Sequence, residues 1–164
     1  MTSTTTPDKS IMPQQRYLLT QLGDVTVVFP LMLVSEMLIL VKSQILPLPF
    51  YDKAVLGCVH KKGQIIPLVS LQQVMGVETG VSKEKLTVVV LNEQAGNLVG
   101  VGLVVDKLLA SLGREELPPE VFNLDISVGE ARRQTQMWLF HSKIMSEGLW
   151  QPQRYQPFDR SKFL

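Results

Sequence analysis

The side chains most able to do chemistry in this sequence are one cysteine and two histidines, Cys58, His60 and His141. Cys58 and His60 are two residues apart, so on a β-strand they would face the same side, as a nucleophile and its base must. A zinc site needs three or four ligands at workable spacing, and neither histidine has a close second one. Because Cys58 lies in a valine-rich run, we expect a buried, inert thiol beside an exposed turn residue. An enzyme that uses Cys58 stays open as an alternative, and thiol reactivity would test it.

Nucleotide binding and acid–base catalysis have little support in the sequence. The glycines between Gly96 and Gly102 lack the spacing of a dinucleotide-binding fingerprint, and no Walker-type phosphate loop or nucleophile-elbow motif occurs. The aspartates are dispersed, and local spacing pairs none of them for proton transfer. We therefore predict a protein that is not an enzyme, needs no cofactor and no metal, and works by presenting surfaces to other proteins.

Composition and charge restrict the class of protein further. Hydrophobic residues make up 45% of the 164 residues and charged residues 19%, which is enough apolar surface for a packed core. A net charge of +1 provides no strong field for nucleic acid. The apolar run Val25–Val41 contains Pro30 and Glu36 and is shorter than a usual span of about 20 residues, so we expect no membrane insertion. A single cysteine fits a reducing compartment, and we expect a cytoplasmic protein.

The turn residues divide the chain into hairpins. The β-prone runs Arg16–Leu22 and Val25–Phe29 flank Gly23-Asp24, a pair typical of tight turns. Gly100 and Gly102 are two apart and should share a face of their strand, where a missing side chain allows close backbone approach. Further strands are predicted at Val55–Val59, Gln64–Val69, Leu86–Leu91, Leu98–Val105, Asp106–Leu112 and Met137–Ile144.

Helices are predicted to be few and short. Leu31–Ile39 places its apolar residues at helical spacing, so we expect a short amphipathic helix there. Leu71–Met75 is expected to form one helical turn that ends at Gly76, and the proline-rich Leu46–Pro49 an extended connector. Gly129–Gln134 is expected to be a loop. Short strands with frequent turns predict an all-β fold, mainly β with short helices, built as small barrels rather than a parallel sheet.

The stretch Leu46–Gly76 resembles the signature region of CheW-like domains, the coupling proteins of chemotaxis. That signature has a proline pair, a glycine-rich hairpin with an arginine, and an apolar strand that contains proline. The matching positions are Pro47, Pro49, Gly57, Val59, Lys62, Gly63, Pro67 and Leu71. Upstream, Phe29–Leu31 and Val34–Met37 are similar to the family's next motif, and downstream Gly102–Leu108 is similar to another. These motifs occur in the family's order over residues 16 to 120.

The resemblance implies two small SH3-like β-barrel subdomains and no catalysis. It implies a CheW-like domain over residues 15–150. The polar composition of residues 1–14 predicts a flexible tail, and residues 151–164 are expected to form a short strand and a terminal helix that completes the domain. The resemblance further implies an adaptor that binds a CheA-type histidine kinase and the cytoplasmic tip of a chemoreceptor, in flagellar chemotaxis or pilus-based motility. The implied kinase-binding residues are Val34, Glu36, Val55, Leu56 and Gly57. The implied receptor-binding residues are Lys62, Gly63, Val105 and Asp106.

Two positions depart from the family pattern. The hairpin arginine is Lys62 here, which keeps the charge but lacks the planar fork for bidentate hydrogen bonds. The aspartate that follows the proline-containing strand is Ser70, and the last third of the chain matches poorly. A second class of function stays open, a β-barrel that binds nucleic acid through Lys61, Lys62 and the neighbouring aromatics Phe50 and Tyr51. Salt-dependent retention on a nucleic-acid column would distinguish it from the adaptor.

Overall fold

The computed structural model describes residues 14–77, 83–122 and 136–150. Three sequence predictions fall largely or wholly outside these ranges, and they stay predictions. They are the N-terminal tail, the loop at Gly129–Gln134 and the C-terminal segment at 151–164.

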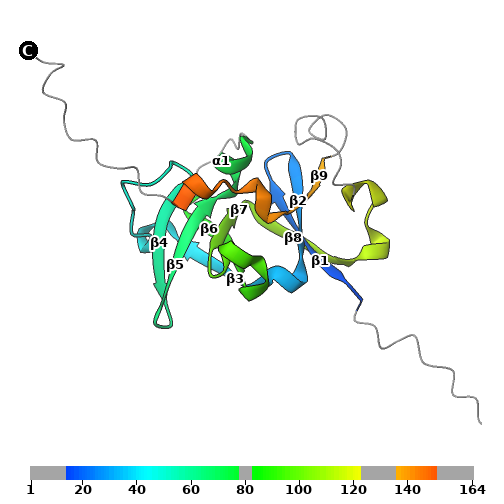
Figure 1. Cartoon of the computed structure of the whole chain (residues 1–164), viewed down its shortest axis with the longest axis horizontal. Helices are drawn as coiled ribbons and strands as arrows, with labels where there is room; N and C mark the ends of the chain where they lie inside the picture. The colour runs from blue at the N-terminus through cyan, green and yellow to red at the C-terminus, as the bar shows by residue number, and fades with distance from the viewer. Residues whose placement is uncertain (1–13, 78–82, 123–135, 151–164) are drawn as a thin grey trace, which may run out of the picture.

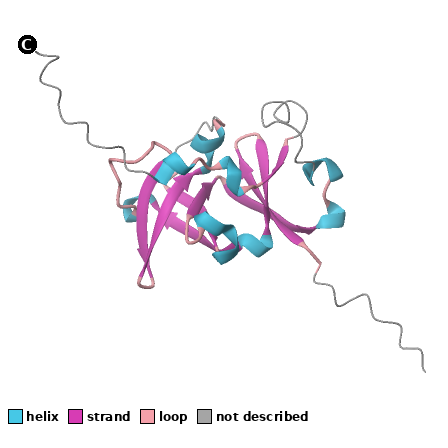
Figure 2. Ribbon diagram, in the orientation of Figure 1, coloured by secondary structure: helices cyan, strands magenta, loops and turns pink. Residues whose placement is uncertain are grey.

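Two β-sheets form the molecule, side by side in Figure 1. One has four strands in the order β8-β1-β2-β9, and the other has five in the order β3-β6-β7-β5-β4. The strands are β1 (Arg16–Leu22), β2 (Val25–Pro30), β3 (Val34–Val41), β4 (Val55–Lys61), β5 (Gln64–Ser70), β6 (Lys85–Leu91), β7 (Gly102–Val105), β8 (Lys107–Gly113) and β9 (Met137–Leu139). Strands dominate the ribbon in Figure 2, which confirms the all-β fold class.

Helical structure is limited to single turns between the strands. The α-helix α1 (Leu71–Met75) ends at Gly76 in the left-handed conformation, as the sequence predicted. The remaining turns are 3₁₀ segments at Leu31–Leu33, Lys42–Gln44, Glu93–Leu98, Arg114–Glu116, Pro119–Phe122, Ser142–Ile144 and Glu147–Trp150.

Both predicted hairpins in the first half of the chain are confirmed. β1 pairs with β2 across Gly23-Asp24, and β4 pairs with β5 across Lys62-Gly63. Lys62 has φ 48° and Gly63 has φ 76°. Positive φ at both central residues belongs to the type I′ turn, whose twist matches that of the flanking strands. The glycine at the second position allows this turn, and Lys62 bears the local strain.

The predicted helix at Leu31–Ile39 is wrong. A single 3₁₀ turn at Leu31–Leu33 leads directly into β3, which pairs with β6 along its length. Leu38 and Leu40 point into the core, whereas Ile39 between them is 74% exposed. This alternation has the period of a strand. The apolar spacing in this run fits both periods, and pairing with a neighbouring strand decided the outcome.

Two strand boundaries also differ from the prediction. The return strand expected at Leu98–Val105 begins only at Gly102, because Gly96 and Gly100 adopt positive φ and turn the chain. Gly100 therefore lies in a turn and shares no strand face with Gly102. The late strand expected at Met137–Ile144 ends at Leu139 and is followed by a 3₁₀ turn.

The buried apolar residues form three clusters. The largest joins the two sheets, with Val27 and Phe29 from β2 packed among Val89 of β6 and Leu103 of β7. A second cluster fills the five-stranded sheet, and a third lies on the far face of the four-stranded sheet. Strands such as β2 and β6 are thus buried on both faces, which explains their continuous apolar runs.

The five-stranded sheet closes on itself through the connector after β3. The backbone of Leu46 exchanges hydrogen bonds of 2.8 and 2.9 Å with the backbone of Cys58 on β4. Because β3 and β4 are the two edges of this sheet, the bridge joins its ends into a small barrel. The extended Leu46–Pro49 connector is confirmed, and it closes the barrel.

Candidate docking surfaces

The predicted binding residues lie at two ends of the five-stranded barrel. β5 and β7 are parallel, with Leu68 opposite Gly102 and Ser70 opposite Val104. Lys62 and Gly63 precede β5, whereas Val105 ends β7. The length of β5 therefore separates them by about 20 Å. The four residues predicted to bind the receptor do not form one continuous patch.

At one end the structure brings together what we call the hairpin-end surface, made of Glu36, Lys62 and Gly63. Val34, at the start of β3, is half-buried and packs against the apolar cluster that joins the two sheets. A salt bridge of 3.3 Å between the Lys61 Nζ atom and a Glu36 carboxylate oxygen connects β3 to the β4–β5 hairpin. The pair lies at the surface, with the two side chains 32% and 40% exposed. Glu36, which the resemblance implies binds the kinase, therefore contacts the residue next to Lys62, which it implies binds the receptor.

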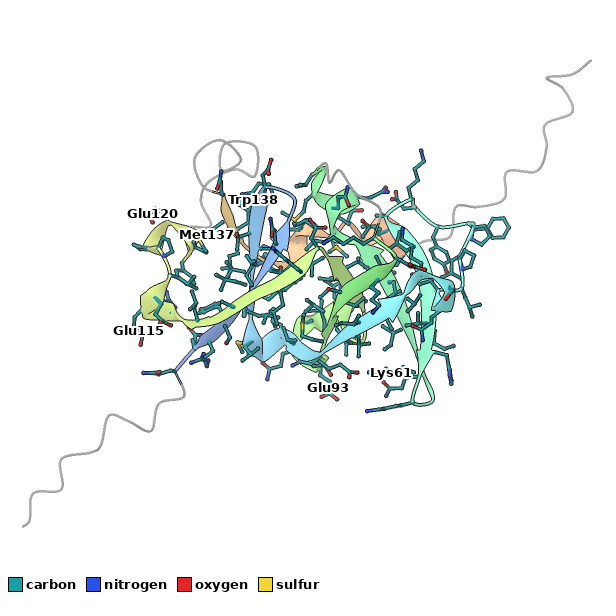
Figure 3. The ribbon with its side chains drawn as sticks, turned by 180° about the vertical axis from the view of Figure 1, so that it is seen from behind. Lys61, Glu93, Glu115, Glu120, Met137 and Trp138 are labelled. Carbon is teal, nitrogen blue, oxygen red and sulfur yellow. The ribbon has the colours of Figure 1, made fainter. Side chains whose placement is uncertain are left out.

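A hollow of about 670 Å³ adjoins the hairpin-end surface. Its lining includes Glu36, Gln64 and Ile65 on one side and Val99 with Gly100 on the other. Ile65 is 70% exposed and Val99 is 52% exposed. Exposed aliphatic side chains beside a charged rim are the composition expected of a protein-binding surface. In Figure 3, Lys61 and Glu93 lie at this end, while Glu115 and Glu120 lie across the molecule beyond β8.

Leu56, Val105 and Asp106 form the crossover-end surface at the other end of the barrel. All three line a second hollow of about 570 Å³. Leu56 is half-buried, Val105 is buried and the backbone of Asp106 leads into β8. The rest of the lining combines an apolar floor with basic residues at the rim. The floor includes Ile45, Pro47, Leu86 and Val104, and the basic residues are Lys42, Lys83 and Lys85.

Val55 and Gly57 are buried and flank Leu56 on β4, at the crossover end of the barrel. Val55 packs in the cluster that joins the two sheets. Gly57 has φ 143°, and a Cβ atom there would lie 2.1 Å from the Leu46 carbonyl oxygen. Only glycine permits the Leu46–Cys58 bridge that closes the barrel. Any direct role of these two residues in kinase binding stays a prediction.

Sequence reasoning missed several residues of these surfaces. Lys61 was not singled out as a partner of Glu36, because their contact depends on how β3 meets a distant hairpin. Ile65 had a readable signal, since strand alternation places it opposite the buried Ile66. Asn92 gave none: its side-chain amide donates to the Met32 carbonyl at 2.7 Å and fixes the 3₁₀ turn before β3.

None of the residues first considered for catalysis lines either hollow. Cys58 is half-buried rather than buried, and His60 is exposed on β4 instead of in the turn. His141 accepts a hydrogen bond from the backbone of Lys143 in a separate turn. Within residues 14–77, 83–122 and 136–150, no three His, Cys, Asp or Glu side chains gather as metal ligands would. Over those same ranges, no helix is long and apolar enough to cross a membrane.

Two β-sheets share one apolar core, and a hollow lies at each end of the closed barrel. A model of the CheW-like domain matches residues 16–128, and the chain belongs to this family. The predicted resemblance is thereby confirmed. The family is one of non-catalytic scaffolds, which supports an adaptor role in chemotaxis signalling.

A solved structure agrees with this assignment at the level of the fold. The crystal structure of the scaffolding protein TtCheW from Thermoanaerobacter tengcongensis superposes with a TM-score of 0.54 at 17% sequence identity. The match covers 62% of this chain and 66% of that one. No curated protein matches the sequence.

Proposed function

We propose that this protein is a cytoplasmic adaptor that couples a chemoreceptor to a CheA-type histidine kinase and so controls motility. The observation that carries the proposal is the position of Glu36 next to the β4–β5 hairpin. By resemblance Glu36 faces the kinase and Lys62 faces the receptor. The Lys61–Glu36 salt bridge joins the two elements that carry them. Kinase and receptor would thus contact the adaptor side by side.

Adjacent contacts offer a physical route for coupling. A receptor helix that moves against the hairpin would displace a side chain only one residue from the partner of Glu36. The hairpin turns through Lys62 and Gly63, which both have positive φ, so its twist matches that of the flanking strands. The exposed Ile65 supplies apolar area to either partner. The charges set the orientation of binding more than its strength.

The remaining predicted contacts extend this arrangement to the crossover end. Leu56 is proposed to contact the kinase there and Val105 to support the receptor-binding groove. We further propose that residues 15–150 form the CheW-like domain and that the C-terminal segment at 151–164 completes it.

A binding assay with separate variants tests the proposal. The full chain is immobilised, and the kinase and a receptor-tip fragment from the same organism are added one at a time and together. We expect Glu36→Arg to weaken kinase binding at least about tenfold. The variant replaces a negative charge by a positive one, which would repel the positive group of the partner that Glu36 attracts. Lys62→Ala should weaken receptor binding and leave kinase binding intact.

Glu120→Arg is the matched control, since it makes the same charge change on the far side of the molecule (Figure 3). It should alter neither affinity. If Glu36→Arg and Lys62→Ala are folded and bind both partners as the wild type does, the assignment of the hairpin-end surface is refuted. If the wild type binds neither partner, the adaptor function itself is refuted.

A further inference from the structure

Asp106 stands where the chain leaves one sheet for the other. β7 ends at Val105 in the five-stranded sheet, and β8 begins at Lys107 in the four-stranded sheet. A single residue therefore makes the crossover. Another covalent link between the sheets is the 3₁₀ turn Leu31–Leu33 between β2 and β3. The two sheets also share an apolar cluster.

Every polar group of Asp106 has a hydrogen bond. Its backbone N–H donates to the Gln21 carbonyl at 2.9 Å. Its carboxylate oxygen Oδ2 accepts from the Gly23 backbone N–H at 2.7 Å. Its own carbonyl accepts from the Lys83 Nζ atom at 3.4 Å. Two of these bonds end on the tip of the β1–β2 hairpin, in the opposite sheet from β7.

The Gly23 N–H needs such a partner. Leu22 and Val25 pair as the last residues of the β1–β2 ladder, which leaves Gly23 and Asp24 as a two-residue loop. Gly23 has φ 60° at the first loop position, and its N–H lies outside the ladder. A carboxylate that accepts from a backbone N–H makes a short, charge-assisted bond, and 2.7 Å is such a distance.

We propose that Asp106 is a positioning residue that fixes the angle between the two sheets, and thereby the geometry in which the docking surfaces meet their partners. Apolar packing is non-directional and allows the sheets to slide on each other. The bonds to Gln21 and Gly23 are directional and define one orientation. This role replaces a direct contact with the receptor, and only its consequence for binding rests on the proposed adaptor function.

We call the hydrogen bonds from Asp106 to Gln21 and Gly23 the clamp. Amide exchange in the full-length chain tests the clamp without any partner. In Asp106→Ala the Gly23 N–H should exchange about tenfold faster or more, as expected when a charge-assisted hydrogen bond is lost. Asp24→Ala is the matched control, because it removes the neighbouring, exposed carboxylate of the same turn. It should leave exchange at Gly23 within about twofold of the wild type. Unchanged exchange in Asp106→Ala would overturn the inference.

Asp106→Asn keeps one side-chain oxygen that can accept the bond, so it should give intermediate exchange at Gly23. If Asp106→Ala does not fold, this variant carries the test, and wild-type exchange in it would equally overturn the clamp. The angle itself is measured between spin labels at Gln64→Cys and Glu120→Cys in a Cys58→Ser background. We expect Asp106→Ala to broaden the distance distribution and Asp106→Asn to restore it in large part. An unchanged distribution in Asp106→Ala would refute the positioning role.

Partner binding then separates the two proposals. A wild-type chain that binds neither kinase nor receptor, yet loses Gly23 protection in Asp106→Ala, would refute the adaptor and keep the clamp. The opposite result would keep the adaptor and refute the clamp: Glu36→Arg weakens partner binding, but Asp106→Ala leaves amide exchange at Gly23 unchanged.

Discussion

Replacing Gly57 by alanine should destabilise the protein strongly without touching an exposed contact. The new Cβ atom would lie 2.1 Å from the Leu46 carbonyl oxygen and 2.9 Å from an Ile45 methyl carbon. Backbone atoms cannot rotate away, so the connector must move and the two hydrogen bonds between Leu46 and Cys58 are lost. Each bond contributes about 1 kcal/mol. The backbone conformation at φ 143° adds about 1–3 kcal/mol of strain for alanine.

The expected loss is therefore about 3–5 kcal/mol, against a total stability of about 5–15 kcal/mol for a domain of this kind. Urea denaturation followed by circular dichroism measures it as a lower transition midpoint at an unchanged slope. Gly63→Ala is the control: its φ is also positive, at 76°, but nothing lies within 4 Å of its Cβ position. That variant should lose only about 1–2 kcal/mol.

The comparison also tests how Gly57 affects kinase binding. If Gly57 acts through the backbone, Gly57→Ala weakens binding only in proportion to the unfolded fraction, and saturating kinase restores it. A Gly57→Ala protein within about 0.5 kcal/mol of the wild type would refute the reasoning, because the closing bridge would then tolerate a side chain.

The remaining predictions concern three other contacts. Gly102→Ala should lower the free energy of unfolding by about 1–3 kcal/mol, because its Cβ atom would lie 2.7 Å from a Val88 methyl carbon in the barrel core. Thermal unfolding measures this, and an unchanged melting temperature would show that the core has room for the extra methyl group. Lys61→Ala combined with Glu36→Gln in a double-mutant cycle should give a coupling below about 1 kcal/mol that falls with added salt. A salt-independent coupling would contradict a surface ion pair. Asn92→Ala should cost about 1–2 kcal/mol and speed amide exchange around Leu33, whose carbonyl accepts from the Asn92 backbone. Wild-type exchange there would mean that the side chain does not hold the turn.

The hairpins could be predicted from sequence because their turns are chemically specific. The turn at Gly23-Asp24 needs positive φ at Gly23, and the turn at Lys62-Gly63 needs it at both residues; glycine adopts this conformation without strain. The segment Leu31–Ile39 could not be predicted correctly, because its apolar spacing satisfies helix and strand alike. What decided it was pairing with β6, some 50 residues later in the chain.

The docking surfaces depended even more on tertiary structure. The resemblance supplied Glu36 and Lys62 as separate motifs, and nothing local places them together. Their proximity follows from the barrel order, in which β3 and β4 are the two edges that meet when the sheet closes. The distance between Lys62 and Val105 follows equally from the parallel pairing of β5 with β7, a long-range pairing that sequence periodicity does not reveal.

Closure of the barrel and the proposed coupling of partners therefore depend on the same edges of one sheet. β4 is joined to the opposite edge of the sheet twice, through the backbone bridge from Cys58 to Leu46 in the connector after β3 and through the Lys61–Glu36 side-chain pair with β3 itself. The first contact is a pair of backbone hydrogen bonds backed by Gly57, whereas the second is a surface ion pair and is weak. A partner that competes for Glu36 or Lys61 can thus open the weak contact while the bridge keeps the barrel closed. An adaptor needs this combination, because its binding surface must respond to one partner without the fold giving way to it.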